Sequence, residues 1–166
     1  MMIAKLVTEL SDSQLFYFSD WPNIQIPKVC AGVYTIYDKN EHLIYVGMAG
    51  AQLTDEKIKA KESAKKESGL YDRLRAHARG YRSGDKFSIY IGDLFVLKEL
   101  TQADVGGISR REKSFDSYIK DYIRRNLSYR YVVTTNDIVR DLEDYIQVNG
   151  INGEMPTINA KRRERS

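Results

Sequence analysis

Two short segments rich in β-branched and aromatic residues, GVYTIYD (32–38) and HLIYVGM (42–48), lie three residues apart in the chain. Side chains of these types favour strands, and the intervening residues 39–41 are compatible with a turn. The pattern predicts an antiparallel hairpin. A chain with this hairpin at its centre is constrained to fold as a sheet on which the other segments pack.

The segments after the hairpin alternate between helical and extended patterns. In GLYDRLRAHARG (69–80), Leu70, Leu74 and Ala78 recur at helical spacing, and Gly80 marks the end of the predicted helix. The next apolar segment, FSIYIGDLFVL (87–97), is predicted to form a third strand that bends at its glycine.

Two further helices flank a last strand. Residues 109–126 predict an amphipathic helix with a single apolar stripe, which consists of Phe115, Tyr118, Ile119, Tyr122 and Ile123. YRYVVTT (129–135) predicts a short strand, and Asn136 or Asp137 is expected to cap a final helix that ends near Val148. This order of elements predicts an α/β sandwich, in which helices flank a small mixed central sheet.

The chain is expected to form one domain. Residues 1–31 are interpreted as an N-terminal segment packed on the core, and residues 32–160 as the domain itself. Within it, residues 50–68 are polar and lysine-rich, which predicts a mobile, partly helical surface insertion. Residues 161–166 form a basic tail.

Composition excludes several classes of protein. No window approaches the ~18 continuous apolar residues that a membrane span needs, and the N-terminus lacks the apolar run of a signal peptide. The single cysteine, Cys30, excludes an internal disulfide and a thiolate-cage metal site, which suits a reducing cytoplasm. The two histidines, His42 and His77, are too few for a multi-histidine metal site, and His42 is expected to be solvated in the hairpin turn.

The net charge is only +3, from 26 basic and 23 acidic residues, but the basic residues gather in clusters. Most charge runs are solvated helix faces, yet several clusters in one short domain favour a polyanionic partner. The arginines predicted to contact nucleic acid are Arg75, Arg79, Arg110, Arg111 and Arg124. The last three are expected on the 109–126 helix, opposite its apolar stripe, where they would contact backbone phosphates.

Each strand of the predicted hairpin carries a tyrosine close to a glycine. The first strand contains Gly32 and Tyr34, the second contains Tyr45 and Gly47, and ten residues separate the two tyrosines. Farther along the chain, one predicted helix carries Arg73 and His77, the last helix carries Glu143, and a loop near the C-terminus carries Asn159. Each residue alone is more often a packing or surface residue than a catalytic one; the order and spacing of the set argue otherwise.

In these motifs and their order, the chain resembles the GIY-YIG nucleases over residues 32–159. Val33 and Val46 stand where isoleucine is usual, and both are expected to be buried. The resemblance implies that Tyr34, assisted by His77, orients or deprotonates the attacking water. It also implies that Arg73 holds the scissile phosphate and that Tyr45 hydrogen-bonds the nucleophile or the phosphate.

Elementary chemistry agrees with these roles. Arg73 and His77 lie four residues apart and therefore project from one helix face. A tyrosine has a reference pKa of ~10, so positive charge or a metal must lower the pKa of Tyr34 if it is to act as a base. Glu143 is expected to bind one Mg²⁺ or Mn²⁺ ion per site, and Asn159 to organise a loop at the site.

The leading hypothesis is therefore a metal-dependent endonuclease that cuts one DNA strand per active site, so that a double-strand break requires a homodimer or two successive cuts. Two alternatives stay open. One is a non-catalytic nucleic-acid-binding module on the same fold, and the other is a phosphodiesterase that acts on RNA or on a nucleotide.

Overall fold

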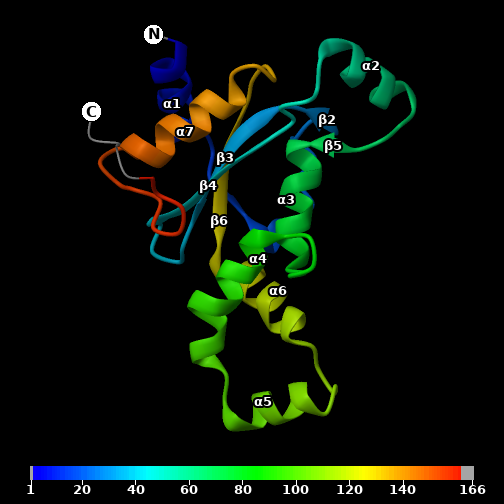
Figure 1. Cartoon of the computed structure of the whole chain (residues 1–166), viewed down its shortest axis with the longest axis vertical. Helices are drawn as coiled ribbons and strands as arrows, with labels where there is room; N and C mark the ends of the chain where they lie inside the picture. Colours follow the sequence, from blue (N-terminus) through cyan, green and yellow to red (C-terminus); the bar gives the residue numbers. More distant parts are fainter. Residues whose placement is uncertain (1, 162–166) are drawn as a thin grey trace.

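The predicted hairpin forms one half of a four-stranded antiparallel sheet (Figure 1). In the computed structural model, which describes residues 2–161, β3 (Gly32–Tyr37) pairs with β4 (Leu43–Ala49) on one side and with β6 (Ser128–Val133) on the other. A short β1 (Phe16–Tyr17) pairs with the far side of β6. The strand order β1-β6-β3-β4 makes β3 a central strand and β4 an edge strand.

A separate parallel pair, β2 (Val29–Cys30) and β5 (Ser68–Gly69), ties the segment before the hairpin to the start of α3 (Leu70–Arg79). Gly80 ends α3 in a left-handed conformation with φ 68°, as the sequence predicted. Helices surround strands that pair both antiparallel and parallel, which confirms the predicted α/β class.

One face of the sheet packs against α1 (Met2–Asp12) and α7 (Val139–Asn149), and we refer to it as the α1/α7 face (Figure 1). Its core is apolar and joins strand residues such as Val33 and Val46, both fully buried as expected, to Leu142 of α7. Aliphatic contacts of this kind stabilise the fold without any chemical role.

The opposite face, the α3/α6 face, packs against α3 and α6 (Phe115–Asn126). Alternate residues of β3 point to opposite sides, so Tyr34 joins this core although its neighbour Val33 joins the other. The α3/α6 face is rich in aromatic side chains and, unlike the α1/α7 face, includes the buried rings that surround His77.

The predicted third strand at residues 87–97 is wrong, because this segment is helical. It forms α4 (Lys86–Ile91), a π-helical turn (Gly92–Val96) and a 3₁₀ turn (Leu97–Glu99). Phe87, Ile91 and Val96 are buried at near-helical spacing, and the side chain of Asp85 caps the first turn by accepting a hydrogen bond from the Phe87 amide. The β-branched and aromatic composition concealed this helical pattern.

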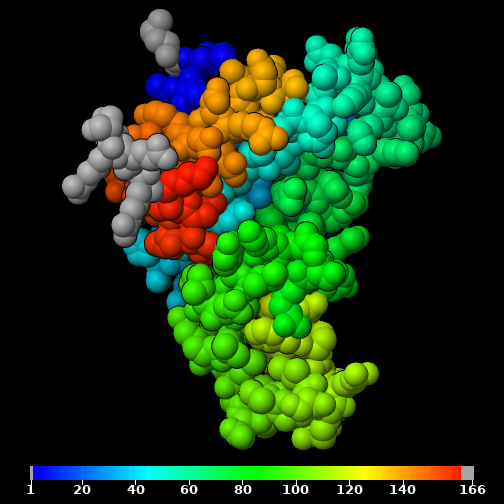
Figure 2. Space-filling model, viewed as in Figure 1, coloured from blue at the N-terminus to red at the C-terminus, as the bar shows by residue number. Residues whose placement is uncertain are grey.

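The helix predicted over residues 109–126 begins only at Phe115, where Ser114 caps it. An additional helix, α5 (Gln102–Ser109), starts at a capping box formed by Thr101 and Asp104. Arg110 and Arg111 therefore lie in the turn between α5 and α6 and not on α6 itself. The turns after α4, helix α5 and the turn before α6 extend away from the sheet and form the narrow lower part of the molecule in Figures 1 and 2.

The polar insertion at residues 50–68 contains α2 (Asp55–Ser63), none of whose residues is buried. Toward the C-terminus, Ile138 precedes α7 without a side-chain cap, so neither Asn136 nor Asp137 has the capping role that the sequence predicted. Of the basic tail, residues 162–166 lie outside the described part of the chain. No helix in the described part is long and apolar enough to cross a lipid bilayer.

Candidate active site

Tyr34 and Tyr45 lie on the same face of the sheet, with their ring centroids 6.4 Å apart. The register places Tyr34 directly opposite Gly47, and the tyrosine ring lies across the glycine. A Cβ atom at Gly47 would stand 2.3 Å from the Tyr34 hydroxyl oxygen, so any larger residue would displace the ring. Gly32 is restricted similarly, because its Cβ would stand 2.4 Å from the carbonyl oxygen of Val132.

The Tyr34 hydroxyl hydrogen-bonds to His77, with 2.6 Å between Oη and Nε2. The other ring nitrogen, Nδ1, lies 2.9 Å from Oδ2 of Asp85. All three side chains are buried. Because a carboxylate can only accept, Nδ1 carries a proton, and in neutral His77 this leaves Nε2 free to accept the Tyr34 hydroxyl proton. The three groups form a directed hydrogen-bond chain from Tyr34 through His77 to Asp85.

Sequence reasoning missed Asp85. Besides His77, its carboxylate accepts hydrogen bonds from the Ser88 hydroxyl at 2.8 Å and from the Phe87 amide at 3.2 Å. Burial alone would raise the pKa of Asp85, but the hydrogen bonds from His77, Ser88 and Phe87 outweigh it and lower the pKa. Asp85 is thus held as a carboxylate. An aspartate directly before an apolar helix is a capping signal, which the strand prediction for residues 87–97 obscured.

Burial raises the pKa of Tyr34 well above 10, and the neighbouring Tyr45 raises it further. Arg73 lowers it, in the direction that the sequence predicted, but does not offset burial. The pKa of Tyr45 is raised to about 12, again mainly by burial. The expectation that nearby positive charge makes Tyr34 acidic is therefore not met by the residues of this chain, and both tyrosines keep their protons at neutral pH.

These side chains open onto a pocket of about 190 Å³. It is lined by Tyr34, Tyr45, Gly47, Met48, Arg73, His77, Asp85, Lys86, Phe87 and Glu143. Five of the six predicted catalytic residues therefore meet in one place. Arg73 is exposed and makes no hydrogen bond or ion pair with the described residues, so its guanidinium is available to an anion. Lys86 supplies a second positive charge that the sequence prediction did not include.

Glu143 reaches the pocket from α7, near the backbone amide of Met48. Burial raises its pKa and Asp144 raises it further, while Lys161, the Met48 amide and Arg140 lower it. Residues 2–161 contain no cluster of three or more His, Cys, Asp or Glu side chains able to hold a metal ion. One partly buried carboxylate that faces an open pocket nevertheless suits Mg²⁺, which keeps several waters and takes its remaining ligands from substrate oxygens.

Asn159 does not line this pocket. Its side-chain Oδ1 accepts from the Val46 amide at 3.2 Å, and its Nδ2 donates to the Val46 carbonyl at 2.7 Å. The adjacent Ile158 amide donates to the Ile44 carbonyl at 2.9 Å, so this segment covers the edge of β4 up to Val46. Asn159 thereby fixes the strand between its two site residues, Tyr45 and Gly47.

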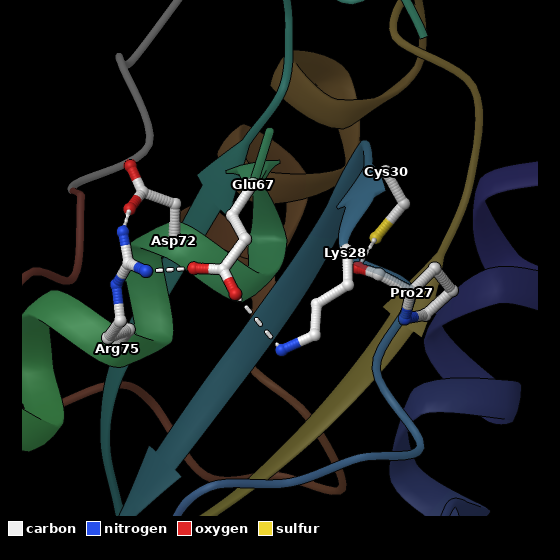
Figure 3. A network of polar contacts seen from close by, with 6 residues as sticks. All are labelled: Pro27, Lys28, Cys30, Glu67, Asp72 and Arg75. Carbon is white, nitrogen blue, oxygen red and sulfur yellow. Dashed lines mark hydrogen bonds and ion pairs between the residues drawn. The ribbon is translucent and has the colours of Figure 1, made fainter. Parts of the chain in front are cut away.

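The five arginines predicted to contact nucleic acid fall into two groups. The first group is bound within the protein. Arg75 forms ion pairs with Glu67 and Asp72 (Figure 3), and Arg110 forms one with Glu112. Arg124 donates hydrogen bonds to the carbonyls of Ala78 and Trp21. Arg79 and Arg111 are exposed and make no hydrogen bond or ion pair within residues 2–161.

Two tyrosines of the sheet, a hydrogen-bonded histidine and an arginine of α3, and a partly buried glutamate of α7 meet at one pocket, which is the arrangement of a nuclease-type domain. The family model described as the GIY-YIG catalytic domain matches residues 17–162, nearly the whole chain, and the chain belongs to this family. Members of the family are generally endonucleases. Comparison with curated proteins gave no match, and comparison with solved structures gave none either.

Proposed function

We propose that this protein is a Mg²⁺- or Mn²⁺-dependent endonuclease that hydrolyses phosphodiester bonds of DNA, cutting one strand per active site. The observation that carries the proposal is the buried Tyr34–His77–Asp85 chain, which ends at a pocket that also contains Arg73 and Glu143. A proton acceptor, a phosphate ligand and a carboxylate for a divalent cation are the groups that phosphodiester hydrolysis requires.

The hydrogen-bond chain provides a route for the proton of the attacking water. As the water attacks phosphorus, its proton passes to the Tyr34 oxygen while the Tyr34 proton passes to His77 Nε2. Asp85 stabilises the resulting imidazolium through Nδ1, as a carboxylate does in a hydrolase triad. This relay never forms a free phenolate, which the raised pKa of Tyr34 would disfavour.

Arg73 binds the scissile phosphate through its planar fork of donors and neutralises the charge that develops in the transition state. Lys86 reinforces this positive charge from the first turn of α4. Tyr45, which also keeps its proton, donates a hydrogen bond to a phosphate oxygen or to the water.

Glu143 is the residue that would hold the divalent ion, which when bound supplies charge neutralisation for the leaving 3′ oxygen. Since only the carboxylate form binds a cation, the raised pKa of Glu143 means that protons compete with the metal ion more strongly here than at an ordinary glutamate.

The test is cleavage of supercoiled plasmid with Mg²⁺, with Mn²⁺ and with EDTA, for wild type, Glu143→Gln and Asp141→Asn. Asp141 is an exposed carboxylate of the same helix turn that does not line the pocket, so it is the matched control. We expect metal-dependent nicking by wild type and by Asp141→Asn, and a loss of at least about 10²-fold in Glu143→Gln.

Wild-type rates in Glu143→Gln would contradict the assigned metal ligand. A wild-type protein that is folded by circular dichroism and binds DNA, yet cuts with neither ion, would contradict the endonuclease and favour the non-catalytic binding module.

A further inference from the structure

A second cavity, of about 340 Å³, adjoins the catalytic pocket and shares Met48 and Arg73 with it. Half of its lining residues are glycine or alanine, and its charged lining residues are Asp72, Arg73 and Arg140. The cavity therefore extends the catalytic pocket past Arg73, the residue assigned to the scissile phosphate. Any substrate strand held by Arg73 must continue beyond it on both sides.

The lining suits a sugar–phosphate backbone and not a base. Three glycines and three alanines keep the walls small, and no aromatic side chain is present on which a base could stack. The polar groups that remain are Gln52, Ser68 and the charged side chains, all of which serve a phosphate or a sugar hydroxyl better than an aromatic ring.

The charge of the cavity is positive. Arg73 enters from α3 and Arg140 from α7, and Arg140 is exposed and makes no hydrogen bond or ion pair with residues 2–161. The single carboxylate of the lining, Asp72, is bound to Arg75 (Figure 3). Two arginines that form no ion pair within residues 2–161 thus face one cavity, and the acidic side chain of its lining, Asp72, is bound to Arg75.

The ion pair between Asp72 and Arg75 belongs to a larger network of charged side chains (Figure 3). Arg75 lies between Asp72 and Glu67, and Glu67 also binds Lys28, with 3.1 Å between Oε1 and Nζ. Arg75, predicted from the sequence to contact nucleic acid, instead compensates the two carboxylates that would otherwise repel a phosphate here. The cations left for the ligand are Arg73 and Arg140.

We propose that this cavity binds the phosphate adjacent to the scissile one on the same DNA strand, with Arg140 as its main contact. The proposal rests on the endonuclease function proposed above. Phosphates recur at every nucleotide, so a strand whose scissile phosphate lies at Arg73 presents its neighbour to the adjoining space. Arg140 is a binding residue that fixes the position of the strand and takes no part in bond cleavage.

The test measures binding in EDTA, because Arg140 also influences the titration of Glu143 and metal binding would confuse the two effects. Wild type, Arg140→Ala, Arg140→Lys and the control Arg125→Ala are titrated by fluorescence anisotropy against a duplex that spans a mapped cut site. Arg125 is an exposed arginine of α6 that does not line the cavity. A second set of duplexes carries one uncharged methylphosphonate at successive positions around the cut.

In Arg140→Ala we expect an affinity about tenfold lower at moderate salt, and a slope of log K against log salt that is smaller by about one. Arg140→Lys should keep the wild-type slope, as should Arg125→Ala. A methylphosphonate next to the cut should weaken wild type by the same factor and have no further effect on Arg140→Ala, since both changes remove one contact.

An unchanged salt slope in Arg140→Ala, or methylphosphonate effects that add to the mutation at every position, would overturn the proposal. If the wild-type protein nevertheless cuts plasmid, only the proposed phosphate subsite is wrong and the proposed endonuclease function is retained. A folded wild type that neither binds nor cuts DNA would overturn both.

Discussion

The two faces of the sheet are built from the same strands but hold different kinds of side chain. On β3, Val33 packs into the aliphatic core of the α1/α7 face, while its neighbour Tyr34 enters the α3/α6 face and hydrogen-bonds to His77. On β4, Val46 and Tyr45 divide in the same way. Both faces bury apolar area, but the α3/α6 face also holds Tyr34 and His77, whose buried polar groups are stable there because each has a partner.

Neighbouring residues of one strand can therefore have separate roles, one in the stability of the fold and the other in the proposed reaction. Each strand of the hairpin supplies both, because alternate side chains point to opposite faces. Substitutions one residue apart should therefore have effects of different kinds, and the following predictions test that separation.

The largest effect is expected for the pair Tyr34→Phe and Val33→Ala. Tyr34→Phe removes the relay hydroxyl and should slow plasmid nicking by about 10²- to 10⁴-fold, with the protein still folded. Val33→Ala should keep its nicking rate and lose about 1–3 kcal/mol of unfolding free energy in a urea titration. A Tyr34→Phe protein that nicks at the wild-type rate would remove the tyrosine from the mechanism.

A smaller effect is expected for Asp85→Asn, since Asp85 acts through His77. The amide cannot hold the imidazolium as a carboxylate does, so nicking should fall by about 10- to 100-fold, as is usual for residues that orient a functional ligand. If Asp85 had a purely structural role, Asp85→Asn would lower the unfolding free energy and leave the pH dependence of the nicking rate unchanged. If Asp85 positions His77, the acidic limb of that pH–rate profile should shift. Ser88→Ala, which removes one hydrogen bond to the same carboxylate, is the control for general loosening.

Asp85 also gives a pH dependence of stability. Its pKa in the folded state lies below the ordinary value of 3.8, so the folded protein binds this proton more weakly than the unfolded chain. The carboxylate therefore stabilises the fold above pH 3.8, and that contribution is lost as the pH falls through the folded-state pKa. The difference in unfolding free energy between wild type and Asp85→Asn should become smaller as the pH falls from 3.8 through the folded-state pKa of Asp85. A difference that stays constant over this pH range would contradict the lowered pKa.

The smallest effect is expected at the edge of β4. Asn159→Ala removes two hydrogen bonds to Val46 and should cost about 1–3 kcal/mol of unfolding free energy, with nicking reduced by less than about tenfold. A loss of nicking above about 10²-fold with little change in stability would instead favour the catalytic role that the sequence pattern predicted for Asn159.

Much of the fold was predictable because local patterns agree with the tertiary structure. The hairpin, α3 with its glycine stop, and β6 have clear periodicity and end signals, and each was predicted close to its observed bounds. The prediction for residues 87–97 failed because Phe87 and Ile91, four residues apart, fit either the strand or the helix period, so side-chain type outweighed spacing. The small helix α5 has a capping box but no apolar stripe, and periodicity could not reveal it.

The candidate site was predicted as far as the family motifs extend. Tyr34, Tyr45, Arg73, His77 and Glu143 line one pocket. Asp85 and Lys86 were missed because they directly precede the segment that was predicted as a strand, so no helix was expected to begin there. The Arg75–Glu67 ion pair and the contacts of Arg124 with the Ala78 and Trp21 carbonyls were not predictable either, since these groups are brought together only by folding.

The contact between the Tyr34 ring and Gly47 constrains the order in which these two positions can change. With the ring in place, any side chain at position 47 meets the hydroxyl group, so the glycine cannot be replaced first. Once a smaller residue occupies position 34, nothing from that ring opposes substitution at position 47. Among proteins descended from a common ancestor, loss of the tyrosine should therefore precede loss of the glycine.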